Sequence, residues 1–161
     1  MLAVRFYDIV LWLHISGAIA AFGGVVAYPV ALSVVRTGHE RGLPAFHKTN
    51  EKITQKVMTW GMIVVLAAGF YLATDADAWQ EPWVSIPLVI IAVLFGIAGG
   101  VITPGERKAS ALAARDIEAS PADGPVTLSA EYEKAARRLR TFAYLATALV
   151  LVATFFMTVK P

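Results

Sequence analysis

One residue in the apolar N-terminal part of the sequence carries chemistry that a membrane interior rarely accommodates. His14 lies in DIVLWLHISGAIAAFGG, residues 8–24, which otherwise has the composition of a membrane-spanning helix. Ionisable side chains are costly inside a bilayer and usually face the interior of a helix bundle. Two roles are open to a neutral imidazole there. It can form a hydrogen bond with a polar group at matching depth, such as Thr154, or it can ligate haem iron axially.

A haem held by His14 would need either a second ligand or an open coordination position. The other two histidines, His39 and His47, fall in polar segments, and we interpret both as solvent-exposed. Met157 lies near the depth of His14 when residues are counted along the expected helices. The alternatives for the sixth position are therefore Met157, water, an open site, or His14 of a second subunit.

The composition indicates which elements position His14. The 161 residues are 57% hydrophobic and 16% charged, and the mean hydropathy is +0.61. A soluble domain carries about 25% charged residues. The apolar residues form four continuous blocks, each near the length that crosses a bilayer as a helix. We expect one all-α membrane domain over residues 1–161, a four-transmembrane-helix bundle with helices near 8–35, 44–74, 83–103 and 129–159 and a cytoplasmic loop over 104–128. The Ala-rich middle of this loop, Glu106–Glu118, could itself form a cytoplasmic helix.

The basic residues predict how this bundle sits in the membrane. Twelve of the fourteen lysines and arginines fall within residues 36–56 and 104–140, whereas the turn TDADAWQEP, residues 74–82, has none. Cytoplasmic loops carry the excess of basic residues. We therefore expect both termini and this acidic turn to be extracytoplasmic. The balance of charges gives no reason to expect nucleic-acid binding.

Several kinds of chemistry lack the residues that they require. Without cysteine the chain has no disulfide, thiolate metal site, cysteine-ligated iron–sulfur cluster or covalently attached c-type haem. The spans contain no carboxylate, which argues against a proton- or cation-coupled carrier built on acidic residues. No zinc or phosphate-binding motif and no nucleophile–base pair is apparent, so the sequence leaves open whether the protein is an enzyme.

Small residues recur four positions apart in the expected helices. The pairs are Gly17 with Ala21, Ala20 with Gly24, and Gly96 with Gly100. This spacing lets helix backbones approach closely. One interpretation is ordinary packing within the bundle. The other is a cleft for a flat cofactor, in which Gly17 and Gly24 would contribute to the binding site beside His14.

Two stretches carry a resemblance to known families. LHISGAIAAFGG, Leu13 to Gly24, resembles the first helix of small bacterial membrane proteins: the copper-resistance-D-like proteins, the membrane protoporphyrinogen oxidases, and a branch of similar four-helix proteins of unassigned function, to which it looks closest. VMTWGMIVVLAAGFYLAT, Val57 to Thr74, is similar to their second helix. The resemblance loosely covers the chain up to about residue 100.

The resemblance implies a role for His14. In the membrane protoporphyrinogen oxidases, the histidine of the first helix ligates haem b, which implies the same role for His14. Those relatives carry basic residues in or near the third helix that bear on activity. Here WVSIPLVIIAVLFGIAGGVIT, residues 83–103, has none, and Arg107 and Lys108 follow only beyond its end. The oxidase activity is therefore not carried over.

Two main functional hypotheses follow, and a third is an enzyme of tetrapyrrole metabolism. The first is an integral membrane protein of the bacterial cytoplasmic (inner) membrane that binds haem b through His14 in an electron-transfer or sensing role. The second is a non-catalytic accessory or structural subunit of a membrane complex without a cofactor. In both, the partners are the lipid bilayer and either a second copy of the chain or other membrane subunits. A homodimer would offer a second His14 to one haem.

Overall fold

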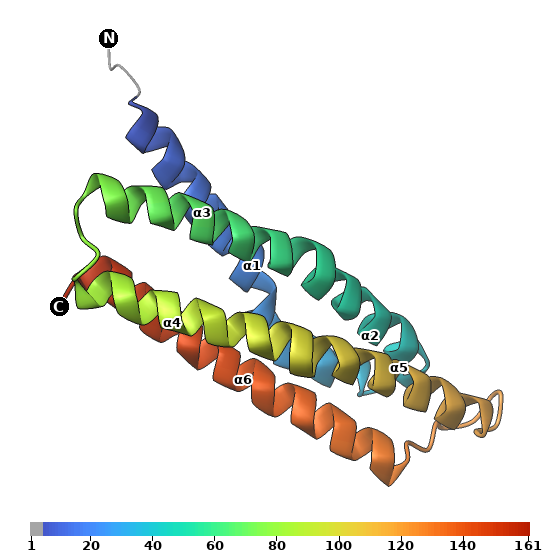
Figure 1. Cartoon of the computed structure of the whole chain (residues 1–161). Helices are drawn as coiled ribbons and strands as arrows, with labels where there is room; N and C mark the ends of the chain where they lie inside the picture. The colour runs from blue at the N-terminus through green and yellow to red at the C-terminus, as the bar shows by residue number, and fades with distance from the viewer. Residues whose placement is uncertain (1–4) are drawn as a thin grey trace.

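The computed structural model describes residues 5–161, and this part of the chain is helical with no strand. Four long helical rods run side by side (Figure 1). All four are long and apolar enough to cross a membrane, which confirms the predicted four-span all-α bundle. The first rod is α1 (Phe6–Val35); the second is α2 (Leu43–Lys52), η2 (Ile53–Met58) and α3 (Thr59–Asp75); the third is α4 (Pro82–Ile97), η3 (Ala98–Ile102) and α5 (Thr103–Glu118); the fourth is α6 (Ala130–Val159).

The helix ends follow local side-chain chemistry. The hydroxyl of Ser129 accepts a hydrogen bond from the backbone N–H of Tyr132 at 3.2 Å, so Ser129 caps α6. Pro44 lies in the first turn of α2, where a residue without a backbone N–H costs no helical hydrogen bond. α1 begins before Asp8, at Phe6. Arg5 is the cap, and its backbone N–H donates to the Asp8 carboxylate at 3.0 Å.

Residues 104–118 are neither a loop, as expected, nor a separate helix over Glu106–Glu118, as the sequence also allowed. They form α5, which continues the third rod without a break. The π-helix η3 precedes Pro104, and the Thr103 hydroxyl donates to the Ala98 carbonyl at 2.9 Å. The helix thus continues through Pro104, which has no backbone N–H to donate. Only residues 119–129 connect α5 to α6.

A second π-helix, η2, joins α2 to α3 in the second rod. At its end, as at the end of η3, a threonine hydroxyl donates to the carbonyl five residues earlier. The Thr59 hydroxyl lies 2.8 Å from the Thr54 carbonyl oxygen. In a π-helix the hydrogen bonds span one residue more than in an α-helix, so the faces of the rod on either side are rotated relative to each other.

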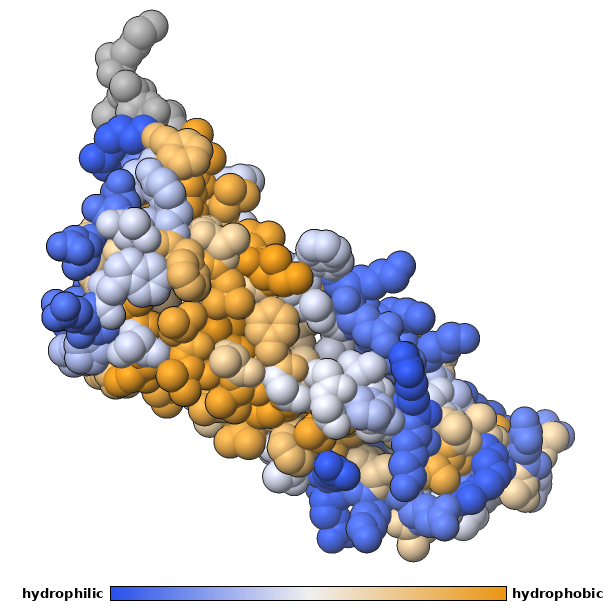
Figure 2. Space-filling view, in the orientation of Figure 1, coloured by the Kyte–Doolittle hydropathy of each residue, from blue (hydrophilic) through white to orange (hydrophobic). Residues whose placement is uncertain are grey.

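The two ends of the bundle differ in composition. Both described chain ends and the α3–α4 turn lie at one end, and the α1–α2 and α5–α6 connections lie at the other (Figure 1). Figure 2 shows hydrophobic residues over most of the surface towards the first end, with hydrophilic residues at its margin, and hydrophilic residues gathered around α2, α5 and the start of α6. We call these the terminal end and the polar end. The assignment of the polar end to the cytoplasm stays a prediction from the basic residues.

The helices pack as two pairs. α1 packs mainly along α3, and α4 mainly along α6, whereas α3 and α4 make few contacts. The core between the pairs centres on Met62 and Leu94, which are almost fully buried. A second core lies at the polar end around Leu43, Tyr132 and Leu139. Towards the terminal end the two pairs diverge (Figure 1), and the principal cavity lies there.

Candidate ligand cavity around His14

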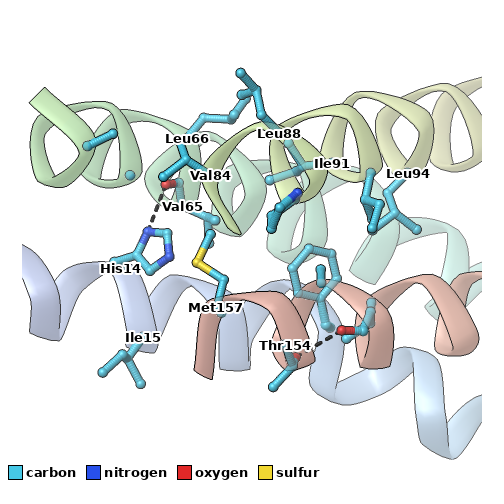
Figure 3. A pocket seen from close by; sticks show the side chains of 18 of the residues that line it. His14, Ile15, Val65, Leu66, Val84, Leu88, Ile91, Leu94, Thr154 and Met157 are labelled. Carbon is cyan, nitrogen blue, oxygen red and sulfur yellow. Dashed lines mark hydrogen bonds between the residues drawn. The ribbon is translucent and has the colours of Figure 1, made fainter. Parts of the chain in front are cut away.

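A cavity of about 580 Å³ lies between α1, α3, α4 and α6 at the terminal end. This volume is within the range of about 300–1,000 Å³ that is typical of ligand sites. Its walls consist mainly of aliphatic and aromatic side chains, including Phe22, Leu66, Phe70 and Leu88. His14 is the only ionisable residue among those that line it. The site is therefore an apolar cavity lined by a single imidazole (Figure 3).

The orientation of His14 is fixed by the backbone of the neighbouring helix. Its Nδ1 atom lies 3.0 Å from the carbonyl oxygen of Val65 on α3. A carbonyl can only accept a hydrogen bond, so Nδ1 must carry the proton and donate. In the neutral ring this leaves a lone pair on Nε2. Thr154 lines the same cavity, but the prediction that it bonds to His14 is wrong, because its hydroxyl donates to the Val150 carbonyl of its own helix at 2.9 Å.

Gly69 on α3 makes room for this ring. A Cβ atom at Gly69 would lie 3.2 Å from Cε1 of His14 and 3.4 Å from Nδ1. The first distance is shorter than an ordinary van der Waals contact, so a larger residue would displace the imidazole. Sequence reasoning missed Gly69. Its only signal was a glycine in the second span, and nothing in one sequence shows which residue such a glycine faces.

The two glycines predicted to flank a cofactor do not line the cavity. Gly17 is buried against α3, where a Cβ atom would lie 3.1 Å from Cγ1 of Val64 and 3.2 Å from the Gly61 carbonyl oxygen. This is the close helix packing that the sequence also allowed, and it brings α1 near enough for His14 to reach Val65. Gly24 is exposed, and no atom lies within 4 Å of a Cβ placed there.

Met157 on α6 lines the same cavity as His14, in agreement with the predicted match in depth. In Figure 3 its sulfur lies on the side of the imidazole that faces away from the Val65 carbonyl. The structure thus brings together two side chains of the kinds that ligate haem iron. No group of three or more histidine, aspartate or glutamate side chains with metal-site geometry occurs within residues 5–161.

The other two histidines have opposite environments. His39 is exposed, as expected. The interpretation of His47 as solvent-exposed is wrong, because its ring is 0% exposed and bonds to Glu106 and Tyr132 at the polar end. The physical reason is that α2 packs along α5, a helix that the sequence analysis placed in a loop. A histidine in an otherwise polar segment gave no sign of this burial.

Four apolar rods with a largely lipid-compatible surface define a multi-pass integral membrane protein. The chain belongs to the family described as "Predicted integral membrane protein (DUF2269)", whose profile matches residues 8–161. Comparison with curated proteins and with solved structures gives no match. The family match supports the expected membrane protein and does not extend to the copper-resistance-D-like group.

Proposed function

We propose that this membrane protein binds haem b in the cavity, with His14 as an axial ligand. The observation that carries the proposal is the hydrogen bond from His14 Nδ1 to the Val65 carbonyl, at 3.0 Å. Histidines that ligate metals almost always donate their other ring N–H to a carbonyl or carboxylate, which fixes the tautomer and the ring orientation. His14 therefore presents a lone pair on Nε2 from a ring that is already held in place.

The surrounding residues fit a porphyrin. The cavity is apolar, lies between helices of a bundle and is large enough for a sizeable ligand. Met157 is available as a second ligand. Lys160 lies at the terminal end, with its ammonium nitrogen 4.5 Å from the centre of the Trp83 ring, and would be the cation for a propionate. Haem b bound there would supply one-electron chemistry or a sensing response in this half of the membrane.

The family resemblance of the first helix gives further support. Leu13, His14, Gly23 and Gly24 match the motif in which the membrane protoporphyrinogen oxidases hold haem b. The same resemblance favours a location in the bacterial cytoplasmic membrane. We do not propose the oxidase reaction, because residues 83–103 contain none of the basic side chains that bear on it in those proteins.

The test is the visible absorption spectrum of protein purified in mild detergent from haem-replete cells. The wild type should show a Soret band, and His14→Ala should lose it while retaining its helical circular dichroism and its elution volume. His39→Ala is the matched control, because His39 is exposed at the polar end and should have no effect.

A second experiment separates ligation from a structural role of the ring. Free imidazole added to His14→Gly should restore haem binding if His14 is the ligand, since the small molecule can occupy the space left by the side chain. A folded wild type without a Soret band after haem reconstitution would overturn the proposal and favour the accessory-subunit alternative. So would a His14→Ala protein that retains the wild-type spectrum.

A further inference from the structure

Three lysines follow one face of the second rod, where its polar part meets its apolar part. Lys48 and Lys52 belong to α2 and Lys56 belongs to η2, and all three side chains are exposed. Each follows the previous one by four residues, a spacing at which side chains on a helix are neighbours on one face. Lys56 directly precedes the apolar stretch that begins at Val57. We call Lys48, Lys52 and Lys56 the lysine row.

The lysine row has no partner of opposite charge within the chain. Among residues 5–161, none of its three ammonium groups forms an ion pair. The acidic neighbour of Lys52, Glu51, is buried and pairs with Arg107 on α5 at 2.6 Å. Arg36 at the same end of the bundle pairs with Glu133, also at 2.6 Å. The charges of the lysine row are therefore available to a ligand outside the chain.

The packing of α1 along the second rod gives the depth of the lysine row. A Cβ atom on Gly17 would lie 3.1 Å from Cγ1 of Val64, so these two positions are level. From there the chain runs towards the polar end in α1 and away from it in the second rod (Figure 1). Val26 follows Gly17 by nine residues, and Lys56 precedes Val64 by eight. At 1.5 Å per residue, both lie about 12–14 Å nearer the polar end, at the same depth.

An exposed valine on α1 matches each lysine in depth. One turn further towards the polar end, Lys52 lies level with Val30, and after another turn Lys48 lies level with Val34. Val26, Val30 and Val34 are 55%, 66% and 57% exposed. The 30 residues of α1 extend about 45 Å, which matches a bilayer of about 40–45 Å including its headgroup regions. The valines and the lysine row therefore lie where hydrocarbon meets headgroups.

The apolar neighbours of the lysine row on its own rod agree with this depth. Trp60 follows Lys56 by four residues on the same face and is 64% exposed. Indole rings concentrate at the level of the headgroups. Ile53 and Val57, beside the row, are 42% and 47% exposed. A lysine among such residues lays its aliphatic stem along the apolar surface and extends its ammonium group towards the headgroups.

We infer that the lysine row binds the headgroup of an anionic phospholipid. The negatively charged headgroup supplies the charge that the chain does not, as basic residues next to membrane spans attract anionic lipids. The acyl chains of the same molecule cover the exposed apolar side chains beside the row, Val57 and Trp60. An acidic protein segment would also neutralise the lysines, but it would leave these two side chains without an apolar neighbour. This inference does not depend on haem at the terminal end.

The experiment titrates the detergent-solubilised protein with phosphatidylglycerol or with zwitterionic phosphatidylcholine and measures bound lipid by native mass spectrometry. The wild type should bind phosphatidylglycerol at least about tenfold more tightly than phosphatidylcholine. The triple variant Lys48→Gln, Lys52→Gln and Lys56→Gln should bind phosphatidylglycerol about 20-fold or more weakly than the wild type, and phosphatidylcholine equally well. Replacing the same three lysines with arginine keeps the charge and should preserve the preference.

Lys108→Gln is the control for loss of an exposed lysine elsewhere. Lys108 lies two residues beyond Glu106, the partner of His47, so it is farther from the membrane part than the lysine row. This variant should keep the wild-type affinity for phosphatidylglycerol. Equal affinity of the wild type for the two lipids would overturn the inference. So would a triple glutamine variant with wild-type affinity for phosphatidylglycerol, and either result would favour an acidic protein segment as the partner.

A fluorescence measurement keeps the inference testable if the triple variant does not fold. The contribution of Trp60 is the part of the wild-type emission that Trp60→Phe lacks. Phosphatidylglycerol with brominated acyl chains should quench this part more strongly than the same amount of brominated phosphatidylcholine. About 0.5 M salt should reduce the difference, because it screens exposed charges. Equal quenching by the two lipids at low salt would contradict a phospholipid headgroup held by the lysine row.

Discussion

A Cβ atom placed on Gly61 of α3 would lie 2.8 Å from the backbone nitrogen of Ala21 on α1. The two backbones therefore touch with no side chain between them, as small residues permit in membrane helices. His14, Gly17 and Ala21 follow one another at spacings of three and four residues, so they share one face of α1. The contact between Ala21 and Gly61 thus also holds the His14 ring against the Val65 carbonyl.

The first prediction concerns this contact. Gly61→Ala should lower the free energy of unfolding by about 1–3 kcal/mol, because the new methyl group forces α1 and α3 apart. Gly23→Ala is the matched control. No atom lies within 4 Å of a Cβ there, so alanine should stabilise that helix by about 0.5–1 kcal/mol. Thermal melting in detergent measures both effects, and equal stability of Gly61→Ala and the wild type would refute the described contact.

The second prediction concerns the space that Gly69 leaves for the imidazole. Gly69→Val should push His14 away from the Val65 carbonyl and weaken haem binding by about 5–30-fold, equivalent to about 1–2 kcal/mol. Haem titration followed by absorbance measures the change. Gly24→Val serves as the control, because Gly24 faces open space. Unchanged haem affinity in Gly69→Val would mean that the ring position is not what determines binding.

The third prediction concerns membrane orientation. The turn over residues 76–81 should be extracytoplasmic, because basic residues concentrate at the other end of the bundle. The chain has no cysteine, so single cysteines can be introduced cleanly. Gln80→Cys should react with an impermeant maleimide in intact cells, and Asp123→Cys should react only after permeabilisation. The reverse pattern would show that the topology is inverted.

The fourth prediction concerns assembly, which we expect to be a homodimer through the first or third rod. Gly96, Gly99 and Gly100 on the third rod are exposed, and no atom lies within 4 Å of a Cβ at any of them. Such a smooth surface allows a second helix to approach closely. Gly96→Leu or Gly100→Leu should shift the mass measured by native mass spectrometry towards the monomer.

Val152→Leu, at an exposed position on α6, controls for added bulk on a lipid-facing surface and should leave the mass unchanged. A wild type that is monomeric at every ratio of protein to detergent would exclude the homodimer. It would also remove His14 of a second subunit as a haem ligand.

The membrane part of the fold could be predicted from the sequence because continuous apolar blocks have one physical outcome in a bilayer, a spanning helix. The position of His14 within such a block also marked it as a candidate site residue. Its partner could not be found in this way, because the bond goes to the backbone carbonyl of Val65, an atom that every residue type possesses. The residue types in a sequence therefore give no signal of such a contact.

The buried pair of His47 and Glu106 was missed for a different reason. His47 and Glu106 are 59 positions apart, and each lies among polar residues that normally indicate solvent exposure. Only the packing of α2 along α5 shows that the two side chains share a buried environment.

The two π-helices have a consequence for how this chain tolerates insertions and deletions. In each rod that contains a π-helix, one residue is inserted relative to a regular α-helix of the same length. The extra residue rotates the polar end by about 100° relative to the membrane part. Removing a single residue from η2 would allow a regular helix to form, but it would rotate His47 away from Glu106. A matching deletion in η3 would turn Glu106 as well. Neither deletion would move His14 relative to Val65, because both residues lie on the membrane side of the π-helices. The polar end can therefore rotate relative to the membrane part without a change at His14.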